Sequence, residues 1–173
     1  MLRWQRFDTV EHSMNPPNDS RKPARQQMRQ GHRLIQVGVS LFLIALLTGL
    51  VVHKMPLPRL ALSAHLLGLM QGTFLVLVGL LWPRLKLGRM FSTATFLLLV
   101  YGCLAAWLAN LLGAIWVAGS SMVPFAAGNA RGTALQEGVI AVGLRSAAAS
   151  LILASLLLLW GLRLDATDGL DAS

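Results

Sequence analysis

The feature that most constrains this chain is an apolar run, LIQVGVSLFLIALLTGLVV, which extends from Leu34 to Val52 without a charged residue. Its length approaches the roughly 20 residues that a helix needs to cross the hydrocarbon core of a membrane. Three further runs follow, at about Leu60–Trp82, Phe91–Val117 and Gln136–Leu162. Because hydrocarbon offers no water to an open backbone, each run predicts a helix rather than a strand.

The composition supports a membrane protein. Hydrophobic residues make up 55% of the chain and charged residues only 13%, whereas about a quarter of the residues in a soluble domain are charged. We therefore predict an all-α integral membrane protein, a bundle of four transmembrane helices. Small-residue faces such as that of Gly68 and Gly72 could pack helices within this bundle or between the copies of a homo-oligomer. The expected parts are a disordered basic tail over residues 1–30, a membrane domain over 31–163 and a short acidic tail over 164–173.

The basic residues are distributed unevenly along the chain, whose net charge is +8. The chain has fifteen Lys and Arg residues. In a four-span chain, one side of the membrane would hold only four of them, which are Lys54, Arg59, Arg131 and Arg145. The positive-inside rule then places both termini in the cytoplasm. No nucleic-acid-binding module accompanies the charge, so we interpret it as a topology signal and expect no nucleic-acid partner.

His65 is a titratable residue about one turn inside the second span, where such groups are costly and often functional. Two interpretations are open: a hydrogen bond to a neighbouring helix or interfacial water, or an imidazole that ligates a metal or haem iron. Helical geometry places Gly68 and Gly72 on the face of His65, where they would clear space for a flat macrocycle, and points Gln71 about 120° away. A single imidazole ligand would leave one iron position open for chemistry.

Polar residues also interrupt the third and fourth spans. Cys103, Trp107 and Asn110 share one helix face, and the amide of Asn110 either joins two helices or orients a substrate beside the Trp107 ring. Glu137, at the start of the fourth span, is either a surface carboxylate or a group that handles protons. Arg145 either snorkels to the interface or pairs with a carboxylate.

Three other features are less specific. The third connection, AGSSMVPFAAGNARGTA, is long for so compact a chain, and such loops often act as a lid or a mouth. Trp82, followed by basic residues, is expected at the membrane interface. The spacing of Tyr101 does not decide whether its phenol is interfacial or in the middle of a helix.

Several segments resemble the hydroxylaminobenzene mutase family. They lie within about Gly31–Arg163 and include HRLIQVGVSLFLIALLTGLVV, PRLALSAHLLGLMQGTFLVLVGLLWPRLKL, YGCLAAWLANLLGAIW and LQEGVI. Members of this family rearrange hydroxylaminobenzene to 2-aminophenol, a step in bacterial nitroarene degradation. The chain is also similar, more distantly, to styrene oxide isomerase, a trimeric four-span membrane enzyme that uses ferric haem b as a Lewis acid to open an epoxide.

The resemblance implies roles for particular residues. The motif AHxxxxxxG places His65 on the relative's axial haem ligand, and Gln71 falls on an asparagine of its substrate pocket. Asn110 falls on the relative's pocket tyrosine, so the Asn/Tyr pair of the isomerase is replaced here by Gln71 and Asn110. This departure disfavours epoxide isomerisation and is compatible with a different substrate.

The expected function is therefore an intramolecular hydroxyl shift on an aryl hydroxylamine in a homotrimer. Ferric haem b would be held by His65 with Gly68 and Gly72 beside it. The other expected site residues are catalytic Gln71, Asn110 and Glu137 and substrate-binding Trp107 and Tyr101. Epoxide isomerisation and non-catalytic haem binding are the alternatives.

Overall fold

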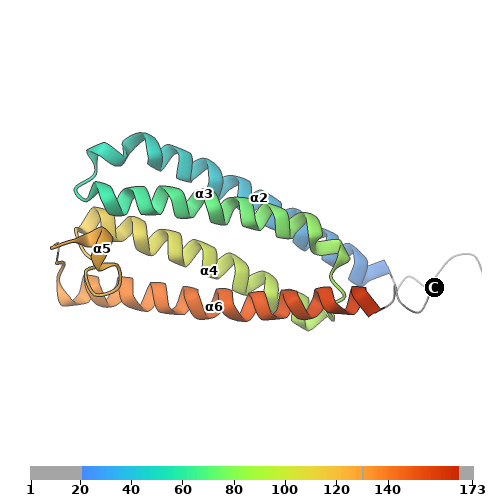
Figure 1. The fold of residues 1–173 in the computed structure, drawn as a ribbon. Helices are drawn as coiled ribbons and strands as arrows, with labels where there is room; N and C mark the ends of the chain where they lie inside the picture. Colours follow the sequence, from blue (N-terminus) through green and yellow to red (C-terminus); the bar gives the residue numbers. More distant parts are fainter. Residues whose placement is uncertain (1–20, 130, 168–173) are drawn as a thin grey trace, which may run out of the picture.

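The structure, a computed structural model, describes residues 21–129 and 131–167, and over these residues it is a bundle of long helices (Figure 1). The helices are α2 (Arg21–Val51), α3 (Pro58–Leu81), α4 (Arg89–Trp116) and α6 (Ala134–Thr167), with a short α5 (Pro124–Ala127) and 3-10 turns at Val52–Lys54 and Trp82–Arg84. All four long helices are apolar and long enough to cross a membrane. The predicted four-helix membrane fold is confirmed.

The helices form two antiparallel hairpins, α2 with α3 and α4 with α6 (Figure 1). The turn between α2 and α3 and the loop over residues 117–133, which contains α5, lie together at one end of the bundle, here named the loop end. The start of α2 and the end of α6 lie at the opposite end, here named the termini end. Proline helps to set these boundaries, because Pro58 occupies the first turn of α3, where its missing N–H costs nothing.

The outer helices extend further than the sequence predicted. Helix α2 begins at Arg21, so residues 21–30 of the expected disordered tail are helical, and α6 continues to Thr167, into the expected acidic tail. The expected disorder is therefore wrong for residues 21–30, and the acidic tail begins as the last turn of a helix. The remaining parts of both tails, residues 1–20 and 168–173, lie outside the described residues.

A glutamine cluster explains why α2 stays ordered beyond its apolar run. Gln27 donates its side-chain amide to the carbonyl oxygens of Trp82 (3.0 Å) and Leu85 (2.7 Å) in the turn between α3 and α4. Gln30 accepts a hydrogen bond from Ser92 at 2.8 Å and one from the Trp82 indole at 3.4 Å. The two bonds of Gln27 satisfy backbone groups that the turn would otherwise leave open. Trp82 is fully buried against the protein, and its expected position at the membrane interface stays a prediction.

Glycines bring α2 and α3 into backbone contact. A Cβ added at Gly72 would lie 2.7 Å from the carbonyl oxygen of Gly38, and one added at Gly79 would lie 2.8 Å from that of Gly31. The two pairs are separated by seven residues on each helix, so the same contact repeats after two helical turns. Small residues permit such close approach, which is the main source of helix association in lipid.

Replacing Gly72 by Ala should separate these two helices. The added methyl group would meet backbone atoms of α2, which cannot move aside as a flexible side chain can, so we expect a loss of about 1–3 kcal/mol in the free energy of unfolding. Gly138→Ala is the matched control, because a Cβ there has no neighbour within 4 Å. Unfolding of both variants in detergent, followed by circular dichroism, tests this. Equal stability of the two variants would contradict it.

Candidate functional site

The imidazole of His65 lies between α3 and α2, toward the loop end of the bundle. Its Nδ1 atom is 2.7 Å from the carbonyl oxygen of Ala45. A Cβ added at Gly49 would be 2.6 Å from both Nδ1 and Cε1 of the ring, so the imidazole occupies the space that a side chain at this position would take. His65 is half-buried, and its ring is fixed by the backbone of the neighbouring helix.

This contact decides which ring nitrogen is available for chemistry. A carbonyl oxygen can only accept a hydrogen bond, so Nδ1 must carry the proton and donate it to Ala45. In the neutral imidazole the lone pair is then on Nε2, which makes no hydrogen bond within the described residues. A histidine that donates Nδ1–H to a backbone carbonyl is the usual arrangement of a metal ligand.

Within residues 21–129 and 131–167, no group of three or more His, Cys, Asp or Glu side chains could hold a metal ion. In a haem, the porphyrin supplies four of the iron's ligands and one histidine can supply a fifth. The tautomer of His65 therefore fits haem ligation.

The two glycines beside His65 are not free to receive a macrocycle, and the expectation that they clear space for one is wrong. The face of Gly72 is filled by the backbone of α2 at Gly38 and Phe42. A Cβ added at Gly68 would lie 2.6 Å from the methyl group of Ala45 and 2.8 Å from Cδ1 of Trp107. The glycines instead let the helices and the indole approach α3 closely.

Trp107 and Gln71 each bury a polar atom that has no hydrogen-bond partner among the described residues. These atoms are the indole Nε1 of Trp107 and Oε1 of Gln71, whose side chain is 8% exposed. Trp107 packs on Gly68. Gly68 follows His65 by three residues in the chain and precedes Gln71 by three. Such an orphaned group costs about 1–3 kcal/mol. The indole N–H is thus a donor, and the Gln71 oxygen an acceptor, that the described residues leave open.

Asn110 lies one turn from Trp107 toward the loop end and is 8% exposed. Its Nδ2 donates to the carbonyl oxygen of Ala106, in the preceding turn of α4, at 2.9 Å. It makes no hydrogen bond to another helix in the described structure, so the interpretation of Asn110 as an inter-helix link is not supported. Its Oδ1 stays available as an acceptor.

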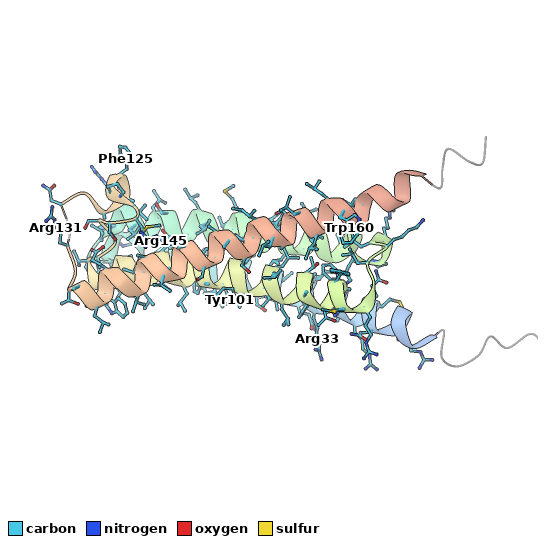
Figure 2. The ribbon with its side chains drawn as sticks, turned by 90° about the horizontal axis from the view of Figure 1, so that it is seen from below. Arg33, Tyr101, Phe125, Arg131, Arg145 and Trp160 are labelled. Atoms are coloured by element: carbon cyan, nitrogen blue, oxygen red, sulfur yellow. The ribbon has the colours of Figure 1, made fainter. Side chains whose placement is uncertain are left out.

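Tyr101 and Glu137 make no hydrogen bond to His65 in the described structure. The Tyr101 side chain is 51% exposed and its hydroxyl is 2.8 Å from Oγ of Ser146, where α4 meets α6. Figure 2 shows Tyr101 at the middle of the bundle, whereas the contacts of Glu137 are with the loop end. A shared role of these two residues with His65 stays a prediction that their contacts do not support.

Glu137 organises the long loop at the loop end. Its carboxylate accepts hydrogen bonds from the backbone N–H groups of Gly119 (2.8 Å), Ser120 (3.3 Å), Ser121 (3.2 Å) and Gly132 (3.2 Å). The hydroxyl groups of Ser120 and Ser121 donate to it as well. The carboxylate thus joins both ends of the loop to the first turn of α6, a structural role that the sequence did not indicate.

Two residues of the site, Ala45 and Gly49 on α2, were not predicted from the sequence. A signal for them existed, because Gly31 and Gly38 on the first span and Gly72 and Gly79 on the second repeat at the same interval of seven. Extending this register by one more interval pairs Ala45 with His65, as the hydrogen bond between them shows.

Comparison with known proteins identifies the relatives of this chain. Residues 30–163 match the family described as styrene oxide isomerase. The chain is 50% identical over 131 residues to hydroxylaminobenzene mutase HabB of Ectopseudomonas oleovorans, which covers 76% of this chain and 80% of the relative. It is 42% identical over 129 residues to hydroxylaminobenzene mutase HabA of the same organism, covering 75% of this chain and 96% of the relative. No solved structure matches significantly.

Gly49→Ala should displace the His65 ring while leaving α2 helical, because alanine favours helices and only the imidazole stands in its way. In protein labelled with ¹⁵N-histidine, we expect a hydrogen-bonded Nδ1–H resonance that disappears in Gly49→Ala. Its assignment to His65 follows from its absence in His65→Gln. Gly138→Ala should keep the resonance, and an unchanged spectrum of Gly49→Ala would contradict the contact.

Glu137→Gln should loosen the loop over residues 117–133, because an amide group cannot replace a carboxylate that accepts hydrogen bonds on both oxygens. Loss of one charge-assisted hydrogen bond, about 1.5–3 kcal/mol, corresponds to an increase of roughly ten-fold or more in loop opening. Limited trypsin cleavage after the exposed Arg131 measures this opening. Arg145→Gln, which also changes a charge on α6, should be cleaved by trypsin at the wild-type rate. Equal cleavage of Glu137→Gln and wild type would disprove the anchoring role.

Proposed function

Because the chain belongs to the hydroxylaminobenzene mutase family, which is related to styrene oxide isomerase, we propose that it rearranges hydroxylaminobenzene to 2-aminophenol. An intramolecular transferase of this kind is supported by both curated relatives. The observation that carries the proposed site is the hydrogen bond from His65 to the carbonyl oxygen of Ala45, which leaves Nε2 as a ligand.

The proposed reaction is an isomerisation and needs no external oxidant or reductant. The N–O bond of the hydroxylamine breaks and a C–O bond forms at the ortho carbon of the ring. The proton of that carbon is lost, and the nitrogen gains one to become an amine. The protein's task is to keep the migrating hydroxyl near the ring until the new bond forms.

His65 would hold ferric haem b through Nε2. When bound, the iron would supply Lewis acidity that polarises the N–OH group of the substrate. The fixed tautomer of His65 supports this role, because the proton on Nδ1 is already committed to Ala45 and the ring cannot rotate without losing that bond. Ala45 and Gly49 would therefore orient the ligand.

Trp107, Gln71 and Asn110 would bind the substrate. Trp107 offers an indole ring beside Gly68, and aromatic faces stabilise the positive charge that develops on the ring as the N–O bond weakens. The unpaired Oε1 of Gln71 and the free Oδ1 of Asn110 are acceptors for the migrating hydroxyl group. Their burial keeps bulk water from competing for the ring carbon.

Apolar side chains beside His65 face the outside of a single chain. Leu62 and Leu66, which flank His65 on α3, are 47% and 51% exposed. A second copy could cover this face, which is compatible with the homotrimer that the resemblance to styrene oxide isomerase implies. We extend the proposal to an inner-membrane enzyme with both termini in the cytoplasm, which the positive-inside rule supports.

Epoxide isomerisation is the second candidate, because residues 30–163 match the styrene oxide isomerase family. Gln71 and Asn110 occupy the positions of that relative's Asn/Tyr pair, and an asparagine side chain cannot supply the phenol. Styrene oxide and hydroxylaminobenzene offered separately to the purified protein distinguish the two. Formation of phenylacetaldehyde alone would favour the epoxide reaction.

His65→Ala tests the proposed function. We expect wild-type protein, incubated with hydroxylaminobenzene in ¹⁸O-water, to release 2-aminophenol without ¹⁸O, because the hydroxyl group never leaves the site. We expect the rate of this reaction to be lower in His65→Ala by a hundred-fold or more. A loss of this size is typical when one catalytic electrostatic contact is removed. Product mass and yield are measured together by liquid chromatography with mass detection.

Two control variants separate chemistry from folding. His65→Gln can still donate a hydrogen bond toward Ala45 but lacks the imidazole, and it should be as inactive as His65→Ala. Thr73→Ala removes an exposed hydroxyl group on the same helix and should keep wild-type activity. Full turnover by His65→Gln, or ¹⁸O in the product, would overturn the proposal.

A further inference from the structure

An open groove on α2 at the termini end is separate from the site around His65. It measures about 400 Å³ and is lined by Met28, Arg29, His32, Arg33 and Gln36. We propose that this groove binds the phosphate headgroup of an anionic lipid, with Arg29 and Arg33 as its cationic ligands.

The cationic side chains of the groove have no acidic neighbour among residues 25–129 and 131–162, whose side chains the structure describes. Arg25, Arg29 and Arg33 recur every fourth residue and therefore share one exposed face of α2. Between residues 25 and 162, Glu137 is the sole acidic residue, and its contacts lie at the loop end. Figure 2 shows Arg33 at the termini end, well separated from Arg131 and Arg145. The described structure thus leaves this cationic face without an internal partner.

The chemistry of the lining suits a phosphate group. Both arginines present planar guanidinium groups, which bind phosphate oxygens with two parallel hydrogen bonds. Gln36 adds amide donors at the edge of the groove. A juxtamembrane Lys or Arg contributes enough attraction to an anionic leaflet to change binding about five-fold for each residue.

The position of the groove favours a lipid over a free phosphate ion. Directly beyond Gln36, the outer face of α2 is apolar and open, with Val39 55%, Leu43 56% and Leu47 55% exposed. A lipid whose headgroup lies in the groove can lay an acyl chain along these side chains, in van der Waals contact with them. An inorganic ion gains nothing from that surface.

Isothermal titration of the full-length, delipidated protein in non-ionic detergent with a short-chain phosphatidylglycerol tests the proposal. We expect saturable binding by wild type and weakening by roughly 25-fold in Arg29→Gln/Arg33→Gln, at about five-fold per arginine. The matched control is Arg59→Gln/Arg131→Gln, which removes the same charge at the loop end and should bind as wild type does. Arg29→Lys/Arg33→Lys keeps the charge and should retain most of the affinity.

Three results would overturn the proposal. The first is a wild type that does not distinguish phosphatidylglycerol from phosphatidylcholine. The second is equal weakening by the control pair, which would mean that net charge rather than the groove attracts the lipid. The third is displacement of the lipid by millimolar inorganic phosphate, which would identify a site for the ion alone. Helical content by circular dichroism confirms that each variant compared is folded.

Discussion

The close packing of α2 on α3 is the constraint on which the rest of the site depends. Glycine pairs bring the two backbones together at Gly31 with Gly79 and at Gly38 with Gly72. Seven residues further along α2 and seven residues back along α3, the carbonyl oxygen of Ala45 accepts a hydrogen bond from His65. His65 stands at the position on α3 where a third small residue would continue the pattern. Because the helices are already in contact two turns away, the imidazole has one way to fit: along α2, over Gly49.

This packing connects stability with chemistry. In lipid, helices associate through close contact rather than through the hydrophobic effect. The packing that holds the hairpin together therefore also fixes the tautomer of the half-buried His65. Burial of the Trp107 indole N–H and the Gln71 carbonyl oxygen without partners acts against stability. Structures tolerate such costs where a ligand compensates for them, which fits a binding site beside His65 in an enzyme of this family.

Hydropathy alone predicted four helices and their order, because a membrane requires long apolar runs and the structure has them. His65 and Trp107 could be singled out because polar groups in such runs are rare. The partners of these residues could not be predicted, since helical periodicity says which residues share a face but not what covers it. For this reason the Gly72 face was assigned to a macrocycle although α2 fills it, and the contact of the Trp82 indole with Gln30 was not foreseen.

Glu137, at the loop end, is another residue whose partners could not be predicted from the sequence. Glu137 stood out as a carboxylate near a membrane, yet its oxygens are occupied by backbone donors from residues more than ten positions away. The most direct test of the account is an absorption spectrum of detergent-purified protein before and after addition of hydroxylaminobenzene. We predict a Soret band that shifts as the substrate binds. Absence of the band from protein that still forms 2-aminophenol would contradict haem ligation by His65.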